Sequence, residues 1–198
     1  SIAVPTSIHY RVATDALLSG VDVLLEKPMT VTLAEADELI EVAARNELVL
    51  QVGHLERFNP AVLAMKPFLT TPVFIESNRI STFKRRGVDV DVVLDLMIHD
   101  IDIITNFVGA DIQLIHAAGA PVICDQVDIA NARLEFASGC VANVTASRIS
   151  LKNQRKLRLF QKDAYLSIDF AAHEIMMIRQ GEGPSQGPIP NMDIQQIS

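Results

Sequence analysis

The chain has 198 residues, of which 49% are hydrophobic and 21% are charged, and its formal net charge is −7. This composition supports one large or two small folded domains and excludes an intrinsically disordered chain. The acidic balance argues against a general binder of nucleic acid or anionic membranes, and no apolar run approaches the roughly 20 residues of a membrane span. Cys124 and Cys140 lack metal-ligand spacing and are too few for a disulfide framework, so we expect a cytoplasmic protein.

The first 52 residues alternate apolar strand patterns with helical patterns. Strands are predicted at residues 2–4, 21–25 and 48–52, and helices at residues 6–19 and 32–46. The second helix begins with a capping box, because Thr32 is followed three positions later by Glu35. Strands and helices in this order and at this spacing predict parallel strands with helices on the faces of the sheet.

The pattern changes after Gly53. The sequence then predicts a short helix at 60–69, a strand at 73–83, an apolar helix at 91–108, and hairpins at 128–149 and 154–170. The resulting fold class is α/β plus α+β. A partial parallel-sheet domain (1–52) precedes an α+β domain with an open, mainly antiparallel sheet (53–180). A Gly-, Pro- and Gln-rich tail (181–198) is expected to be loose.

The tripeptide Glu26-Lys27-Pro28 follows the apolar strand at 21–25. Ligand sites of open parallel sheets lie at the carboxyl ends of the strands. A lysine in that position can hold a substrate hydroxyl, and Pro28 permits a cis peptide that would aim the Lys27 side chain. The alternative interpretation is an ordinary turn with a surface lysine.

The predicted helix at 91–108 is apolar apart from one polar stripe. Asp95, His99, Asp102 and Asn106 recur on one face, which must therefore meet water, a partner or a cavity. Asp95 and His99 are four residues apart, so we predict that the carboxylate orients the imidazole as a general base. A narrow solvated stripe or a core histidine is the alternative. Asp100 points elsewhere and is expected to be an exposed acid.

A metal site could use the same residues. Asp95, His99 and Asp102 would be ligands, with His54 added. Zinc sites usually show tighter signatures such as H-E-x-x-H. We therefore predict that no metal is bound.

Two basic features admit two interpretations each. The guanidinium of Arg57 could bind a phosphate or a carboxylate, or it could form an interdomain salt bridge. Arg148 begins a basic stretch that could bind a phosphorylated substrate, or that could protect a solvated edge strand. The other members of this stretch are Lys152, Arg155, Lys156 and Arg158.

Four motifs occur in order along the chain: AVPTSIH at 3–9, EKP at 26–28, RFNP at 57–60 and DLMIHDID at 95–102. Together they resemble the Gfo/Idh/MocA family (glucose–fructose oxidoreductase, inositol dehydrogenase and relatives) over about residues 1–180. The resemblance implies a Rossmann domain followed by an α+β domain whose open sheet often mediates homo-oligomers. It also implies NAD or NADP as cofactor and hydride transfer at a sugar or polyol carbon.

The resemblance also implies roles for individual residues. Lys27, Asp95 and His99 would be catalytic, with His99 as the proton acceptor. The residues expected at the substrate are Lys27, Arg57, Asp95, His99 and Arg148. Those expected at the cofactor are Pro5, Thr6, His9, Glu26, Lys27, Pro28 and Arg57. Residues 52–60 and 95–102 look most like bacterial UDP-N-acetylglucosamine 3-dehydrogenases, so C3 of that sugar nucleotide is the specific expectation.

One family feature is absent, the G-x-G-x-x-G turn. The family carries it on the first strand, and the opening SIAVP is typical of the end of a buried strand, so we expect a chain that lacks one or two βα units at its front. Without that turn the pyrophosphate has no helix N-terminus, and we expect this chain alone to bind dinucleotide poorly. The absence leaves a second hypothesis open: a non-catalytic sugar-nucleotide-binding or scaffold module that lost its cofactor site.

Overall fold

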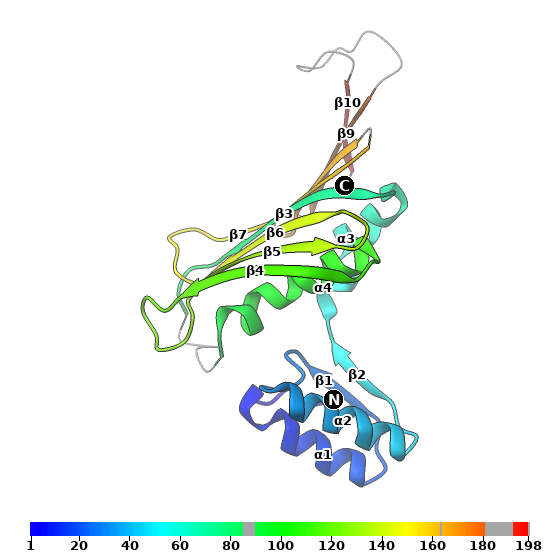
Figure 1. Ribbon diagram of the computed structural model, residues 1–198, viewed down its shortest axis with the longest axis vertical. Helices are drawn as coiled ribbons and strands as arrows, with labels where there is room; N and C mark the ends of the chain where they lie inside the picture. The colour runs from blue at the N-terminus through cyan, green and yellow to red at the C-terminus, as the bar shows by residue number, and fades with distance from the viewer. Residues whose placement is uncertain (85–89, 163, 181–191, 198) are drawn as a thin grey trace.

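A computed structural model describes residues 1–84, 90–162, 164–180 and 192–197 (Figure 1). It contains a two-stranded sheet near the N-terminus and an eight-stranded sheet that follows it. The result is a Rossmann-type domain followed by a domain with a mainly antiparallel sheet, which confirms the predicted fold class. The exact limits of the two domains stay a prediction.

The small sheet is parallel, as its strand–helix order predicted. Strand β1 (Val23–Glu26) pairs in parallel with β2 (Leu50–Gly53), and Ile2 makes a parallel bridge to Leu25 on the other side of β1. Because the strands are parallel, their carboxyl ends share one edge. Figure 1 shows this edge facing the larger sheet.

Two helices pack beside the small sheet. A 3₁₀ turn (Thr6–Ile8) leads into α1 (His9–Leu18), and α2 (Leu33–Arg45) follows β1. The predicted capping box is present, since the Glu35 amide donates to Oγ1 of Thr32 at 3.3 Å and the Thr32 amide donates to Oε2 of Glu35 at 3.1 Å. Apolar side chains of both helices and of β1 form one core.

The large sheet has the strand order β10-β9-β8-β7-β3-β6-β5-β4. Its β3–β6 pair is parallel, and the other pairs of neighbouring strands are antiparallel, including the two predicted hairpins β5–β6 and β7–β8. The bounds are β3 (Pro72–Ile80), β4 (Ile112–Ala120), β5 (Ile129–Phe136), β6 (Val141–Ser147), β7 (Gln154–Gln161), β8 (Ala164–Asp169), β9 (Glu174–Gln180) and β10 (Met192–Ile197).

Helices cover one face of the large sheet. These are α3 (Pro60–Met65), continued by a 3₁₀ turn (Lys66–Phe68), and α4 (Ile98–Val108), which is preceded by a π-helical turn (Val93–Met97). Side chains alternate along β3, so that every second one is buried beneath the helices and the others lie on the opposite face. That face carries polar pairs such as Arg158 with Glu76.

Two details of the large sheet differ from the prediction. Residues 192–197 were expected in a loose tail, but they form β10 and pair with β9. The Gly-, Pro- and Gln-rich composition of the whole tail did not indicate this strand, which is held by its pairing with β9. Residues 181–191 and 198 lie outside the described part. Strand β7 lies between β3 and β8 and is therefore no edge strand. No helix in the described ranges is long and apolar enough to cross a bilayer.

Candidate functional site

Lys27 stands at the carboxyl end of β1 and reaches the second domain. Its peptide bond to Pro28 is cis, as the sequence allowed. Nζ donates a hydrogen bond to the backbone carbonyl of Asp95 at 2.7 Å and lies 3.7 Å from Oδ1 of that residue. Burial, the largest cause, lowers the pKa of Lys27 although the carboxylates of Asp95 and Glu26 raise it. Lys27 is thus a partly desolvated cation between the two domains.

A cavity of about 830 Å³ opens beside Lys27. Its walls come mostly from the ends of the first two parallel segments, and the second domain contributes two residues. The lining residues are Ala3, Val4, Pro5, Thr6, Ser7, His9, Glu26, Lys27, Pro28, Val90 and Asp95. Of the residues predicted at the cofactor, all except Arg57 line this cavity. The structure therefore brings the predicted cofactor residues to one place.

A second, smaller cavity of about 350 Å³ contains His99. Glu26 lines both cavities, so they lie on either side of the end of β1. The other residues of the second cavity come from the end of β2 and from the segment that follows it, namely Gly53, Leu55, Glu56, Phe58 and Asn59. The exposed side chains of Leu55 and Phe58 give it an apolar rim. The Lys27 cavity and the His99 cavity therefore share Glu26 as a wall residue.

His99 is held in its neutral form. Burial lowers its pKa to about 3, and the positive charges of Lys27 and Arg79 contribute in the same direction. Its Nδ1 atom is buried and makes no hydrogen bond within the described part of the chain. A neutral imidazole whose ring lines a cavity can accept a proton from a ligand.

The predicted contact between Asp95 and His99 does not form. No hydrogen bond joins the two described side chains, and the Asp95 carboxylate faces Lys27 instead. The physical reason is the π-helical turn at Val93–Met97, which contains Asp95. Such a turn holds more residues than an α-helical one, so side chains four positions apart no longer stack. Asp95 and His99 thus line different cavities.

Arg57 forms a salt bridge with Asp102 of α4, and both residues lie in the predicted second domain (53–180), so the pair is not the interdomain bridge that was the alternative interpretation. Nε donates to Oδ2 of Asp102 at 2.7 Å, and a terminal nitrogen donates to Oδ1 at 2.5 Å. Nδ1 of His54 lies 3.7 Å from the same carboxylate. The bidentate pair ties the segment after β2 to α4 and occupies the guanidinium within the chain. It gives no support to the predicted contacts of Arg57 with cofactor or substrate.

A buried ion pair beneath the site was missed by the sequence analysis. Asp100 was expected to be exposed, but only 1% of it is accessible. Arg79 of β3 donates to it through Nε at 2.7 Å and through a second nitrogen at 3.2 Å. Burial raises the pKa of Asp100 although the guanidinium lowers it. The available signal was the alternation Ile75, Ser77, Arg79, which places the arginine on the buried face of β3.

Two further predicted site residues have roles inside the fold. His9 is 1% exposed, and its ring nitrogens lie 2.8 Å from the Pro28 carbonyl oxygen and 2.9 Å from that of Val4. Both nitrogens lie against backbone carbonyls, although the residue also lines the large cavity. Arg148 is 3% exposed and donates to Oδ1 of Asp128 at 2.8 Å. It lines neither cavity, which does not support its predicted contact with substrate.

The basic stretch and the metal alternative also find other partners. On β7, Lys156 pairs with Asp169 at 3.2 Å and Arg158 pairs with Glu76. Within residues 1–84, 90–162, 164–180 and 192–197, no group of three or more His, Cys, Asp or Glu side chains is placed to hold a metal ion. Two carboxylates of the metal hypothesis, those of Asp95 and Asp102, instead face basic side chains.

Comparisons with known proteins place this arrangement in a family. The family model described as "Oxidoreductase family, NAD-binding Rossmann fold" matches residues 1–54. The model of the "GFO/IDH/MocA C-terminal domain" matches residues 74–167. The two matches follow the two sheets seen in the structure.

Individual relatives agree with these matches. The chain is 38% identical to UDP-N-acetylglucosamine 3-dehydrogenase of Acidithiobacillus ferrooxidans over 94% of its own length and 60% of the relative. A solved structure of that enzyme superimposes with a TM-score of 0.91, covering 100% of this chain and 63% of the other. Identity to scyllo-inositol 2-dehydrogenase (NAD(+)) of Bacillus subtilis is 26%, over 96% of this chain and 60% of the relative.

A more distant structure shares the fold. Levoglucosan dehydrogenase in complex with NADH and levoglucosan superimposes with a TM-score of 0.87 at 18% identity, covering 99% of this chain and 59% of the other. The chain spans about 60% of the length of the curated relatives it matches. Because both family domains match in the order in which the structure shows them, the chain belongs to the Gfo/Idh/MocA family of oxidoreductases.

Proposed function

We propose that the protein to which this chain belongs is an NAD(P)-dependent dehydrogenase that transfers hydride between nicotinamide and a sugar or sugar-nucleotide carbon. The observation that carries the proposal is the meeting of Lys27 and His99 at adjoining cavities between the two domains. One side chain is a partly buried cation and the other a neutral imidazole. That pair suits the oxidation of a hydroxyl, in which an oxygen must be held while it loses its proton.

The large cavity fits the nicotinamide end of a dinucleotide. It lies at the carboxyl edge of parallel strands, where open α/β sheets bind their ligands, and its volume of about 830 Å³ is typical of a small-molecule site. Thr6, Glu26 and Lys27 would hold the nicotinamide and its ribose. When bound, the nicotinamide would supply the hydride acceptor or donor, and the chain supplies position and proton transfer.

Lys27 has donor capacity to spare for a substrate oxygen. An ammonium group carries three N–H donors, and the Asp95 carbonyl accepts one of them. The remaining donors can hold the reacting hydroxyl and stabilise negative charge on its oxygen. His99, which lines the second cavity, then accepts the hydroxyl proton at a ring nitrogen. Asp95 contributes by fixing Lys27 through its carbonyl and its carboxylate, and not by orienting His99.

We propose UDP-N-acetylglucosamine, oxidised at C3, as the substrate. The support is the 38% identity to an enzyme of that name. The apolar rim formed by Leu55 and Phe58 beside His99 offers a surface on which a sugar ring can lie. No observation favours the alternative of a non-catalytic module, because both proton-handling groups face cavities. Self-association through the sheet of the second domain and a cytoplasmic location stay predictions.

A kinetic assay of the full-length protein tests the proposal. NAD and NADP are supplied in turn with UDP-N-acetylglucosamine, free N-acetylglucosamine or scyllo-inositol, and reduced nicotinamide is measured by absorbance. We expect turnover with the sugar nucleotide, and a loss of about 100-fold or more in kcat for Lys27→Met. Lys66→Met, at an exposed position, is the matched control. Absence of turnover with all three substrates, or full activity of Lys27→Met, would contradict the proposal.

A further inference from the structure

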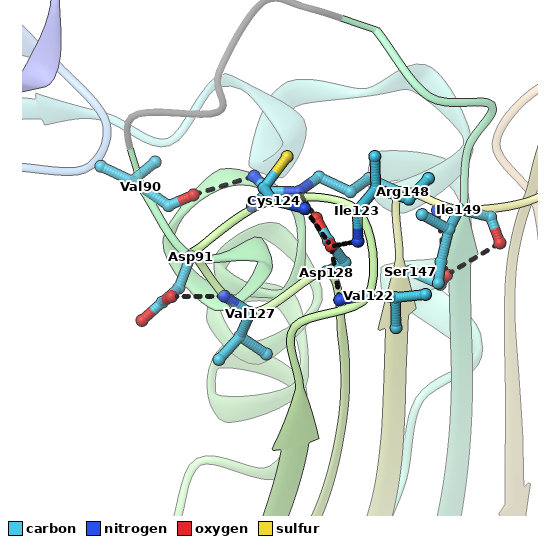
Figure 2. Close-up of polar contacts among 10 residues, drawn as sticks. All are labelled: Val90, Asp91, Val122, Ile123, Cys124, Val127, Asp128, Ser147, Arg148 and Ile149. Carbon is cyan, nitrogen blue, oxygen red and sulfur yellow. Dashed lines mark hydrogen bonds and ion pairs between the residues drawn. The ribbon is translucent and has the colours of Figure 1, made fainter.

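Asp128 lies fully buried immediately before β5. Its carboxylate binds backbone amides of the loop that precedes it. Its Oδ2 atom accepts hydrogen bonds from the amides of Val122, Ile123 and Cys124 at 2.8, 2.6 and 3.0 Å (Figure 2). These amides, together with Arg148, hold the pKa of Asp128 well below its usual range. A carboxylate bonded in this way is a fixed point in the fold.

Arg148 connects this fixed point to the wall of the large cavity. Its Nε donates to Oδ1 of Asp128 at 2.8 Å, and a terminal nitrogen donates to the backbone carbonyl of Val90, also at 2.8 Å. Figure 2 shows the Arg148 side chain lying between these two groups. Val90 lines the cavity that contains Lys27. The buried ion pair thereby fixes the backbone of Val90, which is one residue of the cavity wall.

The next residues continue the connection toward Lys27. Oδ1 of Asp91 accepts from the Val127 amide at 3.0 Å, and the Val92 amide donates to the Val127 carbonyl at 2.9 Å. The Asp91 carbonyl in turn accepts from the Asp95 amide at 3.0 Å, in the first turn before α4. Asp95 then receives the ammonium of Lys27. Hydrogen bonds, together with the peptide bond between Val90 and Asp91, thus connect Asp128 to Lys27.

We propose that the side chains of Asp91, Asp128 and Arg148, here called the polar clasp, position Lys27 by fixing the segment that carries the Asp95 carbonyl. The proposal rests on the proposed function, because the clasp affects activity only if Lys27 acts in the reaction. Arg148 is then a positioning residue, which explains a buried arginine that touches neither cavity. The clasp belongs to the second domain, whereas Lys27 belongs to the first, so it also sets how the two domains meet at the site.

The test measures Lys27 itself in the full-length protein without cofactor. Its pKa is obtained from the pH dependence of competitive acetylation, read by peptide mass spectrometry with Lys66 as internal reference. Two variants differ in one hydrogen bond at equal charge: Asp91→Asn keeps an oxygen that can accept from Val127, and Asp91→Ala does not. Because burial is the main cause of the lowered pKa, we expect a less firmly held and better solvated Lys27 in Asp91→Ala to have a pKa higher than in Asp91→Asn by about half a pH unit.

Arg148→Lys gives a second comparison, because it keeps the charge but cannot reach Asp128 and Val90 with one planar fork. We expect the pKa of Lys27 to rise in this variant too, whereas Arg133→Lys, in an exposed pair on the same sheet, leaves it unchanged. Equal pKa values in folded Asp91→Ala and Asp91→Asn would overturn the proposal, and the Asp91 pair decides if Arg148→Lys fails to fold. None of these measurements needs turnover, so failure of the clasp and failure of the proposed dehydrogenase activity are distinguishable.

Discussion

Two kinds of polar region lie within the second domain and at its border, and they differ in how completely their groups are bonded. The pairs Arg79–Asp100 and Arg148–Asp128 are almost fully buried, with a hydrogen bond of 2.7 or 2.8 Å in each. At the domain border, by contrast, Lys27 is partly exposed, and His99 lines a cavity while its buried Nδ1 makes no hydrogen bond. Buried polar groups need partners, so incomplete bonding beside a cavity marks groups that are available to a ligand.

The comparison predicts opposite consequences of mutation. Losing a partner in a buried ion pair leaves a charge without compensation, which destabilises the fold. Losing His99 or Lys27 removes a group that the fold does not need, which lowers the rate and leaves stability nearly unchanged. Substitutions can therefore distinguish residues that stabilise the fold from residues that are available to a ligand.

The largest expected effect concerns His99. His99→Asn in the full-length protein should lower kcat by about 10²–10⁴-fold, because the hydroxyl proton loses its acceptor. The dissociation constant of the dinucleotide, measured by fluorescence titration, should change by less than about threefold, since His99 does not line the large cavity. His116→Asn, on the exposed strand β4, is the control. A kcat within a few-fold of the parent would remove His99 from the mechanism.

The buried pair beneath the site should show the opposite behaviour. Arg79→Met leaves Asp100 buried without its partner and should lower the free energy of unfolding by about 3–5 kcal/mol. Arg158→Met breaks the exposed pair with Glu76 and should cost at most about 1 kcal/mol. Urea unfolding followed by circular dichroism measures both. Similar losses in the two variants would contradict the distinction between buried and exposed pairs.

Arg57 is intermediate between the two kinds, because its side chain is half exposed but makes a bidentate contact with Asp102. Arg57→Lys cannot reproduce the bidentate contact and should lower the free energy of unfolding by about 1 kcal/mol. Dinucleotide affinity should stay the same, because the guanidinium lines neither cavity. A clear loss of dinucleotide or sugar-nucleotide affinity without any loss of stability would return Arg57 to the ligand-binding residues.

The last expected effect is a pH dependence of stability. At pH values above 6.5, His99 is neutral in both the folded and the unfolded chain, and it contributes nothing. Below that value the unfolded chain binds a proton that folded His99 does not accept until about pH 3, so stability falls as the pH falls. His99→Asn should therefore lose less stability than the parent between pH 7 and pH 5 in urea titrations. An identical loss in both proteins would mean that His99 titrates normally.

Local sequence signals predicted the fold well. The capping box at Thr32 and the strand that ends at Glu26-Lys27-Pro28 depend on neighbouring residues, and both are present. Partners distant in the sequence could not be predicted. Asp100 is buried because Arg79, from another strand, reaches it.

The site shows the same limit. Helical periodicity placed Asp95 and His99 on one face, but it assumed an α-helix, and the π-helical turn separates them. The ring nitrogens of His9 both meet backbone carbonyls that come together only after two strands align. Composition could single out these residues as chemically capable, whereas the three-dimensional contacts decide which of them remain available.

The most direct test is a crystal structure of the full-length protein with bound dinucleotide and UDP-N-acetylglucosamine. The account predicts that the C3 hydroxyl oxygen lies about 3 Å from both Nζ of Lys27 and a ring nitrogen of His99, with Arg57 still bonded to Asp102. A hydroxyl held by other groups, with Lys27 and His99 out of reach, would contradict the assignment of these two residues to the reaction.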